Sequence, residues 1–288
     1  MYHVKQGGRA GYHFFTEELN LRNQARHVLR MELRHALSRG ELVLHYQAKV
    51  DTQTRRLVGV EALVRWQHPL RGMIPPADFI PFAEESGLIL PIGDWVMRTA
   101  CQQNVTWQTA GLPAIRIAVN LSACQFGHHD LVGQVRQVLR DTRMDPQYLE
   151  LELTESVLVQ EAEQAVPTLS RLNDIGIKLS LDDFGTGYSS LNYLRRFPLD
   201  NLKIDRSFIS GMTSNAHDAI IVEAVIALAH NLKLRAIAEG VETREELDLL
   251  AVLGCDEIQG FYFSKPLPAD EFKLLLVEEM LTGAGAKS

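Results

Sequence analysis

Residues 178–183 read KLSLDD, a short apolar run that ends in two adjacent acids, Asp182 and Asp183. Four further runs that read as short buried strands carry, at or near their ends, a side chain able to bind or serve a metal ion. These runs are RIAVN with Asn120, LELTE with Glu152, NLKID with Lys203 and RAIAE with Glu239. Chemistry collected where strands finish is typical of an active site at the carboxyl-terminal end of a parallel barrel.

Strand-like runs alternate with stretches of helical length along most of the chain. Each apolar run is followed by a turn signal and then by a helix-length stretch before the next run. This alternation predicts an α/β fold in which about eight strand–helix units close into a barrel. An open doubly wound sheet is the competing architecture, since it also binds ligands at strand carboxyl ends. The open sheet uses mainly two strands at a switch point, whereas more strands contribute here, so the barrel is favoured.

The start of the barrel is predicted to be irregular. Residues 42–50 and 57–66 both read as strands, and the turn between them is too short to hold a crossover helix. The two strands should therefore be antiparallel. An amphipathic helix is expected over residues 16–39, ended by Gly40. Further helices are expected at 76–86 and 92–110, followed by strand–helix units at 115–142, 148–174, 177–195, 201–231, 234–253 and 257–280.

Composition predicts a soluble, enzyme-sized domain. The chain has 288 residues and a net charge of −7, which argues against attraction to DNA or to an anionic membrane. No apolar run reaches the length of a membrane span, so no membrane contact is expected. Cys101, Cys124 and Cys255 show no short metal-type spacing and are expected to be buried reduced thiols, which favours a cytoplasmic location.

Oxygen ligands dominate the candidate site. Carboxylates and amide oxygens suit magnesium or manganese better than zinc, which prefers His and Cys. Asp182 and Asp183 can both reach one site only if their strand ends there, which the Gly-rich loop 184–190 implies. One of the two acids could then bridge two ions about 3.5–4 Å apart, an arrangement that activates water for attack on a phosphodiester. The expected metal ligands are Glu61, Asn120, Glu152, Asp182 and Asp183.

Each of these residues also has an ordinary structural explanation. Asp183 could cap a turn, Glu152 could pair with a lysine, and Asn120 could simply end a strand. Acids at one end of a core would repel one another unless cations neutralised them, so we favour a metal site. The five acids expected there are Glu61, Glu152, Asp182, Asp183 and Glu239. Lys203 would add a cation where charge develops on phosphate, and Glu155 could hold the loop 184–190 by accepting hydrogen bonds.

Seven segments, taken together and in order, resemble the EAL domain, the phosphodiesterase that hydrolyses cyclic di-GMP to linear pGpG. The resemblance extends from about residue 20 to residue 280, and its linked motifs are far more specific than a single tripeptide. The segments are EALVR at 61–65, VNLSACQF at 119–126, ELTES at 152–156, LDDFGTGYSSL at 181–191, LKIDRSFI at 202–209, AEGVET at 238–243 and IQGFYFSKPL at 258–267.

The resemblance also implies a domain organisation. Residues 1–15 are similar to the end of a GGDEF diguanylate cyclase domain. We therefore expect residues 1–18 to be a remnant of that domain and linker, 19–280 to be the EAL domain, and 281–288 to be a flexible tail. The parent protein would carry an amino-terminal GGDEF domain, and it could also carry sensory domains and be membrane-anchored through its amino-terminal segments. A homodimer is also expected.

For the site, the resemblance implies a modified TIM barrel with one antiparallel strand and roles for individual residues. Glu61, Asn120, Glu152 and Asp182 would hold one magnesium or manganese ion, and Asp182 with Asp183 would serve a second. Glu239 and Gln259 would complete the site, directly or through metal-bound water, with Glu239 as the proposed general base. Lys203 would position the attacking water, so that Glu239, Lys203, Glu61 and Asp182 form the catalytic group.

Gln47 and Arg65 would bind the phosphate or ribose of the substrate, with Asp183 and Gln259 also on the substrate side. Glu155 would steady the loop 184–190, which in this family couples dimerisation to metal binding. Asp205 and Glu242 match further acids of the family pattern and would have supporting roles. Ala48 replaces the usual proline after Gln47, a departure that could loosen this strand end.

Three functions remain open at this point. The first is an active cyclic di-GMP phosphodiesterase, which the complete set of motif residues favours. The second is a module that binds the dinucleotide without cleaving it or serves in protein interactions. The third is a different metal-dependent barrel enzyme in which Lys203 removes a proton beside a carboxylate.

Overall fold

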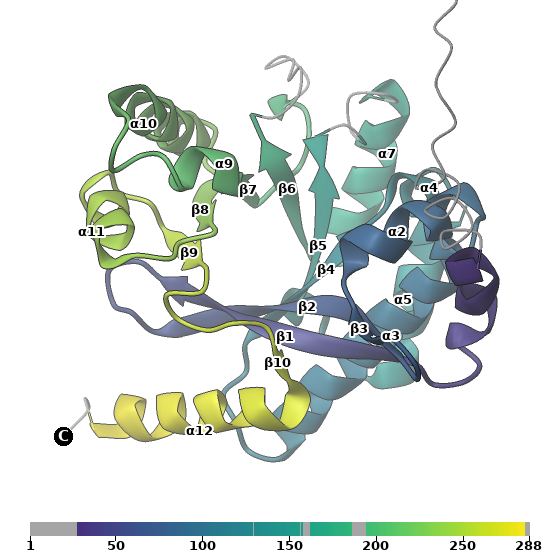
Figure 1. The fold of residues 1–288 in the computed structure, drawn as a ribbon. Coiled ribbons are helices and arrows are strands. Elements are labelled where there is room, and N and C mark those ends of the chain that lie inside the picture. Colours follow the sequence, from purple (N-terminus) through teal and green to yellow (C-terminus); the bar gives the residue numbers. More distant parts are fainter. Residues whose placement is uncertain (1–27, 129, 156, 158–161, 186–193, 286–288) are drawn as a thin grey trace, which may run out of the picture.

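A computed structural model describes residues 28–128, 130–155, 157, 162–185 and 194–285 of the chain (Figure 1). The expected GGDEF remnant and most of the loop 184–190 lie outside these residues. The strands are β1 Leu42–Asp51, β2 Leu57–His68, β3 Gly72–Ile74, β4 Arg116–Leu121, β5 Leu149–Thr154, β6 Lys178–Phe184, β7 Asn201–Ile204, β8 Arg235–Glu239, β9 Glu257–Gln259 and β10 Leu267–Pro268. The helices are α2 Pro76–Glu85, α3 Ile89–Thr109, α4 Ala123–Phe126, α5 Leu131–Thr142, α7 Ala162–Asn173, α9 Arg206–Ile209, α10 Ala216–Asn231, α11 Arg244–Val252 and α12 Ala269–Gly285, with a 3-10 turn at Pro146–Tyr148.

Eight strands close into a barrel in the order β1-β9-β8-β7-β6-β5-β4-β2, and the pairing of β2 with β1 completes the ring. Strand β1 runs antiparallel to both of its barrel neighbours, β2 and β9, and the other barrel pairs are parallel. The predicted barrel with one antiparallel strand is confirmed, and closure excludes the open sheet.

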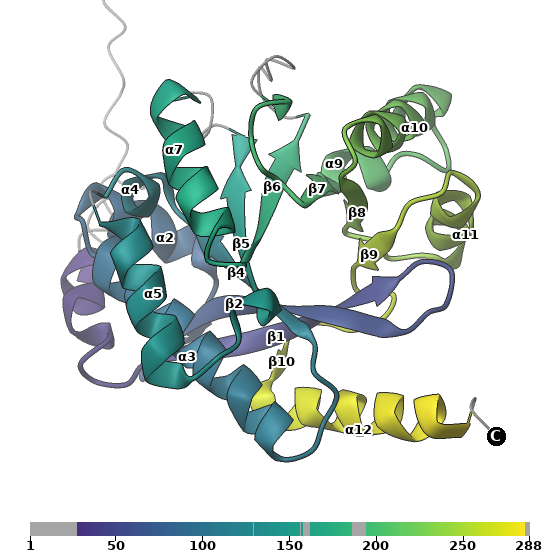
Figure 2. The same cartoon turned by 180° about the vertical axis from the view of Figure 1, so that it is seen from behind.

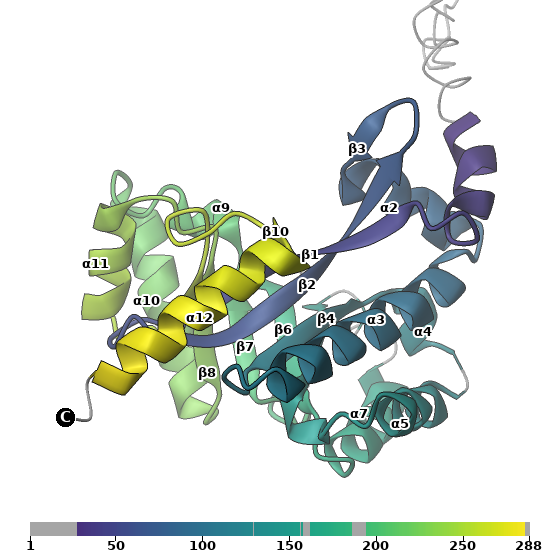
Figure 3. The same ribbon diagram turned by 90° about the horizontal axis from the view of Figure 1, so that it is seen from below.

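Two short strands extend the barrel at its first hairpin. Strand β3 pairs with the far end of β2, and β10 pairs with β1 (Figure 3). Neither was predicted, because two or three residues carry too little alternation to be recognised as a strand.

Helices pack on the outside of the barrel. In Figure 2, α3, α5 and α7 lie on one side and α10 and α11 on the other. No crossover helix follows β1, and α12 runs across this part of the barrel instead (Figure 3). Its Phe272 packs near Trp107 and Tyr46, with ring-centroid distances of 5.3 and 6.3 Å. The helix continues to Gly285, into the segment expected as a tail.

The alternation of strand β5, LELELT, explains why polar groups fill the barrel. Successive side chains of a strand point to opposite faces. Leu149, Leu151 and Leu153 are fully buried among apolar side chains of the core, while Glu150 and Glu152 contact lysines from other barrel strands. The barrel therefore keeps its apolar side chains under the helices and buries acids in its interior.

The remaining expectations are confirmed in part. The helix expected over 16–39 is described only from residue 28, and Gly40 follows it with a φ of 68°, a conformation that favours glycine.

Cys101 and Cys255 are buried, but Cys124 is exposed, so the prediction of a buried thiol was wrong there. Within the described ranges, no helix has both the length and the apolar character needed to cross a membrane.

Candidate active site

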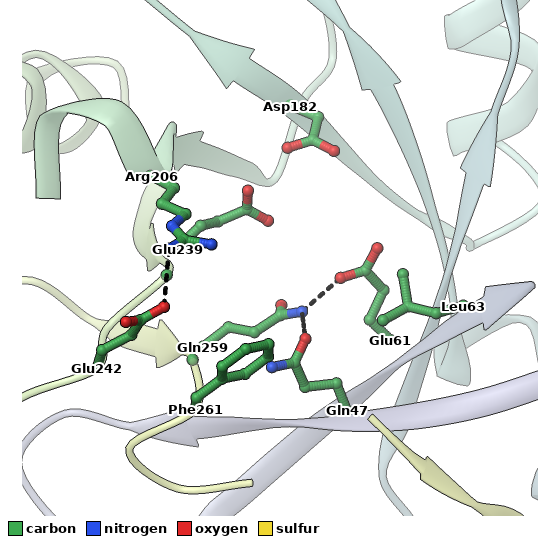
Figure 4. Close-up of a pocket in the computed structure, with 11 residues that line it drawn as sticks. Gln47, Glu61, Leu63, Asp182, Arg206, Glu239, Glu242, Gln259 and Phe261 are labelled. Carbon is green, nitrogen blue, oxygen red and sulfur yellow. Dashed lines mark hydrogen bonds and ion pairs between the residues drawn. The ribbon is translucent and has the colours of Figure 1, made fainter. Parts of the chain in front are cut away.

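A pocket of about 270 Å³ opens at the carboxyl ends of the parallel strands (Figure 4). Acids, amides and one arginine make up most of its wall. The lining residues are Gln47, Glu61, Leu63, Asp182, Arg206, Glu239, Gly240, Glu242, Gln259, Gly260 and Phe261.

Lys203 on β7 lies at the centre of the acidic cluster beside this pocket. Its Nζ is 2.8 Å from Glu152 Oε2, 3.2 Å from Asp182 Oδ2 and 2.6 Å from Glu239 Oε1. The lysine is fully buried. Four parallel strands, β5 to β8, thus place one ammonium among three carboxylates, as the positions of these residues in the sequence predicted.

Glu61 on β2 is held by amide groups from two other barrel strands, β4 and β9. Asn120 Nδ2 donates to Glu61 Oε1 at 2.6 Å, and Gln259 Nε2 donates to Glu61 Oε2. Gln259 Nε2 also donates to Gln47 Oε1 at 3.1 Å (Figure 4). These amides fix both oxygens of the Glu61 carboxylate at the rim of the pocket.

Asp182 and Asp183 reach the site for a different reason from the one predicted. Strand β6 does not end at the two acids but continues to Phe184. Its pairing with β7 shifts register between Leu181 and Phe184, and Asp183 has a φ of 54°. This irregularity interrupts the strict alternation of the strand. Carboxylate oxygens of Asp182, Asp183 and Glu239 lie within 4.8 Å of one another.

Glu155 contacts the loop that begins after Asp183. Its buried carboxylate accepts a hydrogen bond at 3.3 Å from the backbone N–H of Gly185. Gly185 has a φ of 97°, and a Cβ at this position would lie 2.9 Å from the ring of Phe208. The loop therefore leaves the site through a position that only glycine fits well.

The electrostatics of the site reflect an excess of buried acid. Burial raises the pKa of Glu239 to about 8, although Lys203 acts in the opposite direction. Burial and the neighbouring Asp182 also raise the pKa of Asp183. Burial alone would lower the pKa of Lys203, but Asp182, Glu152 and Glu239 hold it well above its ordinary value. An all-oxygen set with surplus negative charge fits hard divalent cations.

Arg65 is the candidate that the structure leaves apart from this pocket. The arginine is half-buried, its Nη1 donates to the Val64 carbonyl at 2.9 Å, and it is not among the described residues that line the pocket. Its assignment to substrate stays a prediction.

Sequence reasoning missed Arg206 and Phe261 in the pocket wall. Arg206 Nη2 lies 2.9 Å from Glu242 Oε1, and a Cβ at Gly240 would overlap the Arg206 side chain. Both residues belong to segments already quoted, LKIDRSFI and IQGFYFSKPL, so their place beside the candidates Asp205 and Gln259 was the available signal. Asp205, expected in a supporting role, caps α9 by accepting from Ser207 N at 3.0 Å.

The strand end at Ala48 is hydrogen-bonded to the segment that follows β9. Its backbone N–H donates to Ser264 Oγ at 3.4 Å, and the neighbouring Gln47 donates through Nε2 to the Ser264 carbonyl at 3.1 Å. A proline would lack the first of these donors. Alanine therefore adds a contact between β1 and the segment that follows β9.

A closed α/β barrel with an oxygen-rich carboxylate centre at its strand ends has the architecture of metal-dependent barrel enzymes. Residues 30–266 match the EAL domain family, to which the chain belongs.

The chain is similar to the bifunctional diguanylate cyclase/cyclic di-GMP phosphodiesterase MucR of Pseudomonas aeruginosa PAO1, with 47% identity over 271 residues, 94% of this chain and 40% of MucR. It is 42% identical to the cyclic di-GMP phosphodiesterase PdeR of Escherichia coli K12 over 273 residues, 95% of this chain and 41% of PdeR. The chain thus spans about two fifths of the length of these relatives.

Solved structures of EAL proteins have a similar fold. The MucR phosphodiesterase in complex with c-di-GMP superposes with a TM-score of 0.83 at 47% identity, covering 85% of this chain and 99% of that one. The EAL enzyme Bd1971, bound to cAMP and cyclic di-GMP, superposes with a TM-score of 0.84 at 32% identity, covering 90% of this chain and 72% of that one.

Proposed function

We propose that this chain is a metal-dependent phosphodiesterase that hydrolyses one phosphodiester bond of cyclic di-GMP and releases linear pGpG. The observation that carries the proposal is the arrangement of Lys203 among Glu152, Asp182 and Glu239 at the edge of the pocket. The names of the relatives MucR and PdeR, and the nucleotide in the MucR complex, support this substrate.

The oxygen-rich side chains are suited to hold magnesium or manganese, and we propose two ions. Glu61, Asn120, Glu152 and Asp182 would hold the first ion, and Asp182 with Asp183 would hold the second. The mutual approach of the Asp182, Asp183 and Glu239 carboxylates supports this assignment. When bound, such ions neutralise phosphate charge and make water more acidic.

The chain's own residues divide the remaining work. The Glu239 carboxylate is the proposed base for the attacking water, and Lys203, 2.6 Å from it, stabilises negative charge that develops during the reaction. Gln47, Gln259 and Arg206 line the pocket and offer donors to phosphate or ribose oxygens. As the water oxygen forms the new bond to phosphorus, one water proton passes to Glu239. The bond from phosphorus to one ribose oxygen breaks, and that oxygen leaves as a hydroxyl with a proton returned from Glu239 through solvent.

Product analysis tests the proposal and separates it from a module that only binds nucleotide. The purified chain is incubated with cyclic di-GMP and Mg²⁺ or Mn²⁺, and chromatography follows pGpG. We expect pGpG in both metals and none in excess chelator. Binding of cyclic di-GMP without any pGpG would show a binding module instead.

Calcium provides a second test of the ligand set. Ca²⁺ accepts looser and more numerous oxygen ligands than Mg²⁺ and would misplace the attacking water. We expect Ca²⁺ to allow nucleotide binding and suppress turnover by about a hundredfold, the scale of a lost catalytic interaction. Equal rates in Ca²⁺ and Mg²⁺ would argue against metal-assisted hydrolysis at this site.

Besides cyclic di-GMP, the expected partners are a second copy of this chain and the amino-terminal domains of a longer parent protein. The bifunctional name of MucR supports an amino-terminal GGDEF domain in the parent protein. The homodimer and the cytoplasmic location stay predictions, and sedimentation of the purified chain tests the first.

A further inference from the structure

Beneath the acidic cluster, the barrel interior contains a second polar layer. Its members lie two positions along a barrel strand from a residue of the site, and residues two apart on a strand share a face. All of them are buried. They are Lys49 on β1, Glu150 on β5, Ser180 on β6, Asn201 on β7 and Glu257 on β9.

Lys49 connects this lower layer with the site above it. Its Nζ lies 2.9 Å from Glu150 Oε1 and 2.6 Å from Glu152 Oε1. The other oxygen of Glu152, Oε2, lies 2.8 Å from Lys203 Nζ. The carboxylate of Glu152 is therefore held between two ammonium groups, one on each oxygen.

This double contact matters because the terminal torsion of a glutamate is broad and selects no single orientation of the carboxylate. Two cations on opposite oxygens define the carboxylate plane. Without Lys49, Lys203 would be the one cation left on Glu152 among the residues that the structure describes, and Lys203 also contacts Asp182 and Glu239. Lys49 thus supplies a constraint that no acid of the site can replace.

The lower layer fixes Lys49 in turn. Glu150 Oε1 accepts from Ser180 Oγ at 2.6 Å, and Ser180 Oγ accepts from Asn201 Nδ2 at 2.8 Å. Gly59, paired with Lys49 across β1 and β2, has no side chain, and a Cβ there would lie 3.6 Å from Lys49 Cβ. The long lysine therefore runs through the barrel along a path that its neighbours define.

We propose that Lys49 is a positioning residue that orients the Glu152 carboxylate for metal binding. The inference rests on the proposed function, which assigns Glu152 as a metal ligand. Partners that orient a ligand typically contribute tenfold to a hundredfold to metal affinity.

A charge-matched pair of variants tests this role. Glu150→Gln removes one negative charge and keeps the contact of Lys49 with Glu152. Lys49→Met combined with Glu150→Gln also removes the positive charge, which leaves the net charge of the layer as in the parent chain. Direct Mn²⁺ titration, followed by electron paramagnetic resonance without nucleotide, measures affinity independently of turnover.

We expect Glu150→Gln to bind Mn²⁺ within about threefold of the parent and the double variant to bind about tenfold or more weakly. If Lys49 acted only as a buried charge, removing it in the Glu150→Gln background would make Mn²⁺ binding tighter, because the site would become more negative. Equal or tighter binding by the double variant, relative to Glu150→Gln, would overturn the proposal.

Lys49→Arg is the second variant, used if the double variant does not fold, as judged by the loss of a cooperative unfolding transition. It retains the charge but changes the reach and shape of the donor. Weaker Mn²⁺ binding supports positioning, and parent-like binding overturns it. A parent chain that neither binds Mn²⁺ nor forms pGpG would instead refute the proposed function.

Discussion

At the scale of single residues, Lys203 makes charged contacts with three carboxylates of the site, Glu152, Asp182 and Glu239. It is buried, and it is not among the described residues that line the pocket. We therefore expect Lys203→Ala to reduce kcat by at least about a hundredfold while the affinity for cyclic di-GMP changes only a few-fold, as for a group that acts mainly in the transition state. Rates of pGpG formation and binding isotherms in Ca²⁺ give the two quantities.

A parallel loss of affinity and turnover would show that Lys203 holds the nucleotide or the metals rather than the developing charge. Glu242→Gln is a matched control, because Glu242 lies at the pocket wall but contacts Arg206 instead of Lys203. It should leave kcat much closer to the parent value.

Ala48 allows a residue-scale prediction about the departure from the family pattern. Its N–H donates to Ser264 Oγ at 3.4 Å, a long hydrogen bond. Proline also restricts the preceding residue to extended conformations, which Gln47 already adopts in β1. Ala48→Pro should therefore change unfolding free energy by no more than about 1 kcal/mol, with kcat/KM within about threefold of the parent.

Thermal unfolding and steady-state kinetics check this, with Ser264→Ala as the control that removes the acceptor of the same bond. A loss of activity much larger in Ala48→Pro than in Ser264→Ala would mean that the backbone of β1 cannot accept proline here.

At the scale of elements, the end of β6 and the loop after it connect the metal ligands to Glu155. The acid bonds to Gly185 N, directly after the segment that contains Asp182 and Asp183. We expect Glu155→Gln to weaken the hold on this loop, lower activity at low Mn²⁺ and recover in part at high Mn²⁺. Asp183→Asn should not recover, because a proposed ligand is lost.

Activity measured across a Mn²⁺ titration distinguishes the two variants. If the Glu155→Gln curve overlays that of the parent chain, the bond to Gly185 has no part in metal binding.

The same element shows where sequence reasoning succeeded and where it failed. The two acids were correctly expected at one site, but through a strand that ends at the pair itself, before Phe184. The irregular pairing with β7 and the positive φ of Asp183 produce that convergence, and both depend on neighbouring strands that a one-dimensional pattern does not contain.

At the scale of the whole molecule, the sequence predicted the acids around Lys203 at the strand ends. It did not predict the second polar layer beneath them, which contains Lys49 and Glu150. Acids at strand ends stand out because a loop follows them. Glu150 lies inside an alternating strand, and alternation reads equally well as a solvated face. Only ring closure brings Lys49 from β1 to Glu150 on β5 and identifies these charges as buried.

This buried layer predicts acid sensitivity. Burial would raise the pKa of Glu150, but Lys49, Arg116 and Ser180 lower it to about 2 from its ordinary value of 4.5. Because the folded-state pKa is depressed, the ionised Glu150 stabilises the fold above about pH 4.5, and this contribution disappears as the pH falls towards 2.

Glu150→Gln should therefore be less stable than the parent by a few kcal/mol (about 1–4) at neutral pH, with a difference that shrinks on acidification. Urea unfolding between pH 7 and pH 3, followed by circular dichroism, measures both chains. A difference in stability that stayed constant across this range would contradict the role of the Glu150 charge.

The most direct test of metal-assisted phosphodiester hydrolysis at the barrel end is the rate of pGpG release as a function of free Mn²⁺. The measurement compares the parent chain with Asp182→Asn, which removes the carboxylate assigned to both ions. We predict a saturable Mn²⁺ dependence for the parent and at least about a thousandfold lower rate for Asp182→Asn at every concentration. Full activity of the parent in chelator, or parent-like activity of Asp182→Asn, would contradict hydrolysis at this site.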